Sequence, residues 1–138
     1  MAPTILHVED NADNRQIVRD LFSALGYRII EAEDGALGVE MAHRMVNELD
    51  IILMDIQLPK MSGYEAIRAI KSNLNLRDIP IIVITSYAMS GDDRKALEAG
   101  ADDYIAKPYK PRELRNKVED LIARRKGKDN GKTQDSRG

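Results

Sequence analysis

Residues 51–63 read IILMDIQLPKMSG, a short apolar run that ends in a carboxylate and leads into a turn. An apolar run of this length, bounded by turn residues, predicts a strand that is buried on both faces. Pro59 and Gly63 mark the loop that follows. Asp55 is therefore expected at the carboxyl tip of a buried strand, where a charge is costly unless a cation or a proton compensates it.

Similar runs recur along the chain and alternate with helical patterns. Apolar spacing of i, i+3 and i+4 predicts the helices, and glycine or proline separates the elements. The expected strands are 4–8, 28–32, 51–55, 81–85 and 103–106, and the expected helices are about 13–25, 35–46, 64–72, 92–99 and from 111 onward.

This alternation predicts an α/β fold in which helices cover both faces of a five-stranded parallel sheet. Right-handed crossovers leave few topologies, and we expect the doubly wound, flavodoxin-like strand order 2-1-3-4-5 with five helices. That order places strands 4–8 and 51–55 side by side. Glu9 and Asp10 then meet Asp55 at one rim of the sheet, which Thr85 and Lys107 also reach.

Composition narrows the class of protein. The length of 138 residues predicts one domain, and the formal net charge is only -2. The chain has no cysteine, which excludes disulfides and thiolate metal sites. The apolar runs are too short to cross a bilayer, and the first residues do not resemble a signal peptide. We therefore expect a cytoplasmic protein that does not bind membranes.

The apolar pattern stops near residue 124. Residues 124–138 contain no large apolar residue and carry six basic against two acidic side chains, a net charge of about +4. We expect a folded domain over residues 1–123 and a basic, disordered tail over 124–138. The tail is expected to be solvated rather than to bind nucleic acid.

The residues gathered at the rim supply what phosphoryl transfer requires. Carboxylates are hard ligands for Mg²⁺, and one of them can accept a phosphoryl group as an aspartyl phosphate. A lysine ammonium offsets charge on the transferred group, and a threonine hydroxyl can donate a hydrogen bond to it.

Four stretches carry a resemblance to a known family. VEDN (8–11), LMDIQLPKMSG (53–63), VITSYAM (83–89) and EAGADDYIAKPY (98–109) follow the order and spacing of the response-regulator receiver domains of bacterial two-component signalling. The chain is similar to the stand-alone, single-domain members, and the resemblance covers about residues 3–124. It implies a signalling switch rather than an enzyme, since such a domain catalyses only its own phosphorylation and dephosphorylation.

The resemblance also implies roles for single residues. Asp55 would accept the phosphoryl group, and Glu9, Asp10, Asp55 and the Gln57 backbone carbonyl would hold Mg²⁺, Glu9 chiefly through water. The family often has two aspartates where this chain begins with Glu9.

Further positions would sense or tune the phosphoryl group. Thr85 and Lys107 would contact it, Tyr104 would be the switch aromatic, and the peptide bond before Pro108 would be cis. Gln57 and Tyr87 lie two residues after Asp55 and Thr85, where they are expected to tune hydrolysis, with Tyr87 slowing it.

The implied partners are a histidine kinase or a histidine phosphotransfer protein as the phosphoryl donor. A downstream protein would read the face formed by helix 92–99, strand 103–106 and the last helix. The chain would be a monomer or a weak homodimer, in a two-component pathway or a phosphorelay. His7 is expected to be a packed strand residue, and His43 an exposed helix residue.

Three other functions compete with this interpretation. A phosphorylation-independent interaction module on the same fold would predict a degraded site, whereas all the key positions are present. A nucleotide- or flavin-binding enzyme would need a phosphate loop rich in glycine or in serine and threonine. Here the turn at residues 9–13 reads EDNAD, which repels anions unless a metal intervenes, and no GxGxxG or GxxxxGK[ST] motif occurs. Direct DNA binding through the tail would be steeply salt-dependent.

Overall fold

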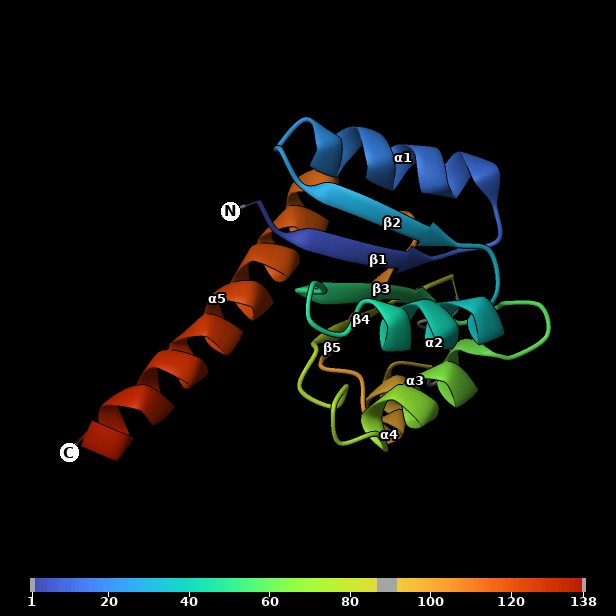
Figure 1. Cartoon of the computed structure of the whole chain (residues 1–138). Coiled ribbons are helices and arrows are strands. Elements are labelled where there is room, and N and C mark those ends of the chain that lie inside the picture. The colour runs from blue at the N-terminus through green and yellow to red at the C-terminus, as the bar shows by residue number, and fades with distance from the viewer. Residues whose placement is uncertain (1, 87–91, 138) are drawn as a thin grey trace.

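The fold is an alternating series of strands and helices (Figure 1). The computed structural model describes residues 2–86 and 92–137. Its elements are β1 (Thr4–Val8), α1 (Ala12–Ser23), β2 (Arg28–Ala32), α2 (Gly35–Arg44), β3 (Ile51–Asp55), α3 (Gly63–Lys71), β4 (Ile81–Thr85), α4 (Asp92–Ala99), β5 (Asp103–Ala106) and α5 (Pro111–Arg137).

All five strands are parallel and follow the order β2-β1-β3-β4-β5, which confirms the predicted topology. β1, β3 and β4 are buried throughout, as expected for inner strands of a sheet covered on both faces. β2 is only partly buried, in keeping with its place at the sheet edge. The register aligns Val8 with Met54, so the tips of β1 and β3 end at the same level.

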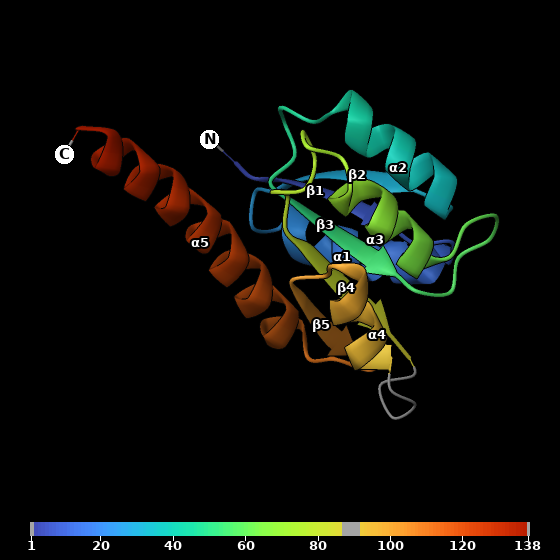
Figure 2. The ribbon, with the colours of Figure 1, turned by 90° about the horizontal axis from the view of Figure 1, so that it is seen from below.

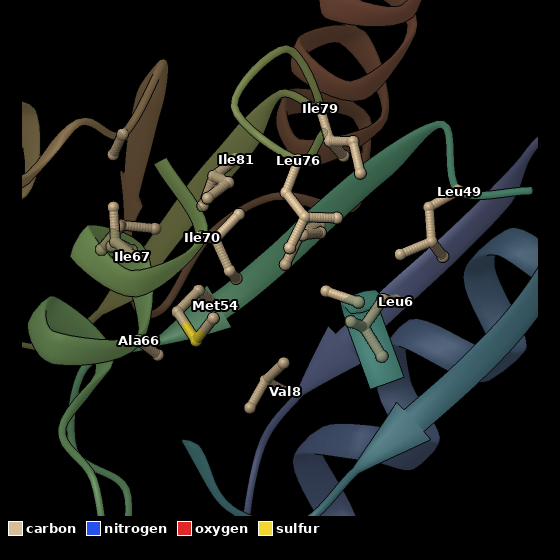
Figure 3. Close-up of a cluster of buried hydrophobic side chains, with 14 of the residues drawn as sticks. Leu6, Val8, Leu49, Met54, Ala66, Ile67, Ile70, Leu76, Ile79 and Ile81 are labelled. Atoms are coloured by element: carbon tan, nitrogen blue, oxygen red, sulfur yellow. The ribbon is translucent and has the colours of Figure 1, made fainter. Parts of the chain in front are cut away.

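Two hydrophobic clusters hold the helices against the sheet. One contains Leu6, Met54 and Ile67 and lies under α2, α3 and α4 (Figure 3). The other contains Phe22 and Leu114 and lies under α1 and α5. Figure 2 shows the same arrangement from below, with α5 beside the sheet and its end extending past it. Alternating strand residues feed the two clusters, because successive side chains point to opposite faces.

The first helix differs slightly from its predicted pattern. α1 ends at Ser23 rather than Leu25, and Gly26 follows with a positive φ of 85°. Ile17 and Leu25, two apolar residues at helical spacing within the predicted helix 13–25, remain 51% and 40% exposed. Leu25 stays exposed because the helix ends before it, whereas Val18 and Phe22 pack into the cluster under α1 and α5.

The last helix is longer than the apolar pattern predicts. α5 continues to Arg137, so residues 124–137 are helical in the structure where we expected a disordered tail. A helix makes its backbone hydrogen bonds within itself, so a polar segment can extend a turn that packing has already formed. Arg125 fixes part of the extension by donating from Nη1 to the Leu49 carbonyl at 2.9 Å.

No helix in the described ranges is long and apolar enough to cross a membrane.

Candidate functional site

The strand order brings the predicted acidic residues together at one rim of the sheet. β1 and β3 are neighbours, and Glu9 and Asp55 follow the aligned pair Val8 and Met54. Carboxylate oxygens of Glu9, Asp10 and Asp55 all lie within 4.8 Å of one another. The cleft they share has a volume of about 240 Å³ and is also lined by Gln57, Thr85 and Lys107.

Asp55 is the last residue of β3 and is held at the bottom of this cleft. It is only 7% exposed, and its Oδ1 accepts a hydrogen bond from the Gln57 backbone N–H at 3.3 Å. Gly63, the first residue of α3, packs against the Asp55 carbonyl so closely that a Cβ there would collide with it. The Gly63 N–H also donates to the Ile56 carbonyl at 2.9 Å, so α3 begins directly on the strand tip.

Glu9 is the buried member of the acidic pair and Asp10 the exposed one. Burial raises the pKa of Glu9 above its ordinary value, the neighbouring Asp55 carboxylate raises it further, and Lys107 opposes both effects. The acidic turn is fixed from two sides. Its Glu9 N–H donates to the Ala32 carbonyl at 2.9 Å, and Arg15 Nη1 donates to the Glu9 carbonyl at 2.9 Å.

Lys107 supplies the positive charge facing the carboxylates. Its Nζ lies 3.1 Å from Glu9 Oε1 and 3.8 Å from Asp55 Oδ2. The Lys107 N–H donates to the Thr85 carbonyl at 2.7 Å, which joins the tips of β4 and β5. The Lys107–Pro108 peptide bond is cis, as the family resemblance implies.

The remaining predicted residues lie at the same rim, elsewhere in the fold, or outside the described ranges. Thr85 ends β4 and is 1% exposed. Tyr104, on β5, is partly buried against the cluster under α2, α3 and α4. Tyr87 lies outside the described residues. His7 is 1% exposed and His43 is exposed, so the structure confirms the predicted environments of both histidines.

The donor set fits a hard divalent cation. Three carboxylates that converge on an open cleft leave a negative charge that Lys107 alone offsets only in part. Carboxylate and carbonyl oxygens are the ligands that Mg²⁺ prefers, and an accessible cleft leaves room for the waters it retains. Neither a histidine nor a cysteine, the usual ligands of zinc, belongs to this acidic cluster.

Sequence reasoning missed two residues that shape this site. From the sequence, Gly63 marks only a loop, although its lack of a side chain allows α3 to approach Asp55. Arg15 lies on α1, where an arginine is an ordinary helix residue, and only the fold shows that it reaches back to Glu9. A glycine at a strand-to-helix junction is a signal that could have been used, whereas nothing in the spacing of Arg15 pointed to the site.

Comparison with known proteins agrees with this geometry. Residues 5–119 match the response regulator receiver domain family. The polar-differentiation response regulator DivK of Brucella ovis is 40% identical over 108 residues, which are 78% of this chain and 86% of the relative.

Solved structures show the same fold. The receiver domain of a sensor histidine kinase from Pseudomonas aeruginosa, which has a magnesium ion coordinated in its active-site cleft, is 40% identical with a TM-score of 0.83, over 89% of this chain and 99% of that one. The receiver domain of a signal transduction histidine kinase from Syntrophus aciditrophicus is 32% identical with a TM-score of 0.81, over 88% of this chain and 91% of that one. The chain belongs to the response regulator receiver domains of two-component signalling.

Proposed function

We propose that this protein accepts a phosphoryl group on Asp55 from the phosphohistidine of a kinase or phosphotransfer protein, with Mg²⁺ as cofactor. The observation that carries the proposal is the convergence of the Glu9, Asp10 and Asp55 carboxylates within 4.8 Å, with Lys107 Nζ 3.8 Å from Asp55. Two like-charged neighbours make an attack by Asp55 unfavourable unless cations compensate, and the site has the ligands and the lysine to do so.

In the transfer, a carboxylate oxygen of Asp55 attacks the phosphorus of the donor. A P–O bond forms as the P–N bond to the imidazole breaks, and the leaving imidazole nitrogen keeps the electron pair. Glu9, Asp10, Asp55 and the Gln57 carbonyl would hold Mg²⁺, Glu9 chiefly through water, and the bound ion supplies charge neutralisation on the phosphoryl oxygens.

Side chains around Asp55 then respond to the aspartyl phosphate. An aspartyl phosphate brings additional negative charge into a cleft where Lys107 is paired with Glu9 at 3.1 Å. We infer that Lys107 and Thr85 move toward the phosphoryl oxygens and that Tyr104 turns inward behind Thr85. Such a shift between two states would change the face formed by α4, β5 and α5, which a downstream protein recognises.

The direct test is incubation with Mg²⁺ and acetyl phosphate, a small phosphoryl donor, followed by intact mass spectrometry. The unaltered protein should gain one phosphoryl group, and Asp55→Asn should gain none. Glu9→Gln should slow the gain without abolishing it. If the unaltered protein gains no mass, or if Asp55→Asn gains as much, the phosphorylation switch is refuted and a phosphorylation-independent interaction module takes its place.

Partner binding can be tested with the same samples. A pull-down with protein treated with beryllofluoride, which mimics the phosphoryl group, should retain proteins that the untreated protein does not. Identical retention would contradict the proposed switch of the α4–β5–α5 face. The cytoplasmic location and the monomeric or weakly dimeric state expected from the sequence stay predictions.

A further inference from the structure

Arg15 lies in α1 and reaches back to the end of β1. Its side chain is only 14% exposed, although an arginine on the first turns of a surface helix can easily extend into water. Nη1 donates to the Glu9 carbonyl at 2.9 Å, and Nη2 lies 3.8 Å from the exposed carboxylate of Glu33. One guanidinium therefore contacts the segments that follow β1 and β2.

The segment it contacts carries two of the three clustered carboxylates. β1 ends at Val8, so the Glu9 carbonyl lies just beyond the strand, and Arg15 supplies a charged donor to it. Further along the turn, the Asn11 N–H donates to Glu9 Oε2 at 3.3 Å, and the Arg15 N–H donates to the Asn11 carbonyl at 3.0 Å. Backbone and side chain of Arg15 thus fix both ends of the Glu9–Asn11 turn.

Arg15 differs from Lys107 in the atom it contacts. Lys107 pairs with the Glu9 carboxylate itself, which is the group that would face a metal. Arg15 binds the Glu9 main chain and leaves both carboxylate oxygens to other partners. A guanidinium is planar, permanently charged and able to donate in two directions at once, which a lysine ammonium cannot reproduce with the same geometry.

We propose that Arg15 is a positioning residue for the Mg²⁺ site, holding the Glu9–Asp10 turn so that both carboxylates face Asp55. This inference rests on the proposed function and names a residue that the family resemblance did not assign. The alternative is that Arg15 acts only as a nearby positive charge. The two roles predict opposite effects on Mg²⁺, because loss of positioning weakens binding whereas loss of a repelling cation strengthens it.

The experiment measures the Mg²⁺ dissociation constant of purified Arg15→Met, which keeps the apolar stem of the side chain but loses the guanidinium. We expect the constant to rise about tenfold, equivalent to about 1.4 kcal/mol. Arg15→Lys keeps the charge and one donor but loses the fork, so its effect should have the same direction and be smaller. Arg19→Met is the matched control, because Arg19 lies on the same helix and pairs with Glu31 at 2.8 Å instead. Its constant should equal that of the unaltered protein.

Two further measurements separate positioning from general loss of structure. In metal-free Arg15→Met, amide hydrogen exchange at Asn11 should be about tenfold faster, while exchange in the inner strands is unchanged. At saturating Mg²⁺, phosphoryl uptake from acetyl phosphate should return close to the rate of the unaltered protein, since only the affinity for the ion is affected.

An Mg²⁺ dissociation constant in Arg15→Met equal to or lower than that of the unaltered protein would overturn the proposal, as would unchanged exchange at Asn11. If Arg15→Met does not fold, the Mg²⁺ dissociation constant and the amide exchange at Asn11 are measured in Arg15→Lys, and unchanged values there would overturn the proposal. Absence of phosphoryl uptake by the unaltered protein would instead refute the proposed function and leave the Mg²⁺ comparison standing.

Discussion

His7 is a buried imidazole on β1, and it should make the protein sensitive to acid. The residue is 1% exposed, and its Nδ1 has no hydrogen-bond partner among the described residues. Burial, followed by the charges of Lys107 and Arg15, lowers the pKa of His7 from 6.5 to about 3. The folded protein therefore keeps His7 neutral at pH values where the unfolded chain has already bound a proton.

The sign and size of the effect follow from this difference. Below pH 6.5 the unfolded state binds more protons than the folded state. The contribution of neutral His7 to the free energy of unfolding is therefore fully present above pH 6.5 and is lost as the pH falls toward about 3. Each unit of pKa difference corresponds to about 1.4 kcal/mol. At about pH 4.5 the free energy of unfolding should therefore be lower by about 2–3 kcal/mol from this residue alone, and the full loss approaches about 5 kcal/mol at lower pH.

The assay is urea unfolding of the metal-free protein at neutral pH and at about pH 4.5, with EDTA present. His7→Leu removes the titrating group and places an apolar side chain in a buried strand position. Between the two pH values, the free energy of unfolding should fall by about 2–3 kcal/mol more in the unaltered protein than in His7→Leu. His43→Gln is the matched control, because His43 is exposed on α2, and it should behave like the unaltered protein. An equal loss in His7→Leu and the unaltered protein would refute the reasoning.

Three further predictions concern phosphorylation and the binding of Mg²⁺. Gly63→Ala should destabilise the protein by about 1–3 kcal/mol and slow phosphoryl uptake, because its Cβ would press on the Asp55 backbone. Gly26→Ala is the control: its positive φ strains the new residue, but nothing lies within 4 Å of the new Cβ, so phosphoryl uptake should stay unchanged. Equal uptake rates in the unaltered protein, Gly63→Ala and Gly26→Ala would contradict this account. On acidification, the affinity for Mg²⁺ should begin to fall at a higher pH than it would if Glu9 had an ordinary pKa. The pKa of Glu9 is raised, and a protonated carboxyl group is a poorer ligand than a carboxylate. Glu9→Gln should bind Mg²⁺ more weakly at neutral pH and show a flatter pH profile in the same titration, and a profile identical to that of the unaltered protein would exclude Glu9 as the titrating group. Tyr87→Ala should shorten the lifetime of the aspartyl phosphate, measured by the decay of the phosphorylated mass, and an unchanged lifetime would show that Tyr87 does not slow hydrolysis.

The strands were predictable because buried parallel strands are short, continuous apolar runs. Thr4–Val8 and Ile51–Asp55 agree with their predicted bounds, and the strand order followed from their alternation with helices. The acidic cluster could be predicted as well, since the expected strand order makes β1 and β3 neighbours and the tips of neighbouring parallel strands lie close together. These features depend on local pattern and on a small set of allowed topologies.

Other features depend on contacts between segments that are distant in sequence or on packing that periodicity does not describe. Ile17 has the apolar spacing of a core-facing residue of α1 yet is 51% exposed, whereas its neighbour Val18 packs into the cluster under α1 and α5. The contact of Arg15 with Glu9 requires the chain to turn between strand and helix at a specific angle. No apolar pattern predicts the extension of α5 to Arg137, because a helix can continue through backbone hydrogen bonds alone.

The identity of the phosphorylated residue is the central claim, and chemical mapping tests it most directly. Borohydride reduction converts an aspartyl phosphate into homoserine, which peptide mass spectrometry locates in the sequence. After treatment with acetyl phosphate and Mg²⁺, homoserine should appear at position 55 and be absent when either reagent is omitted. Homoserine at Asp10 or at another carboxylate, with Asp55 unmodified, would contradict the account.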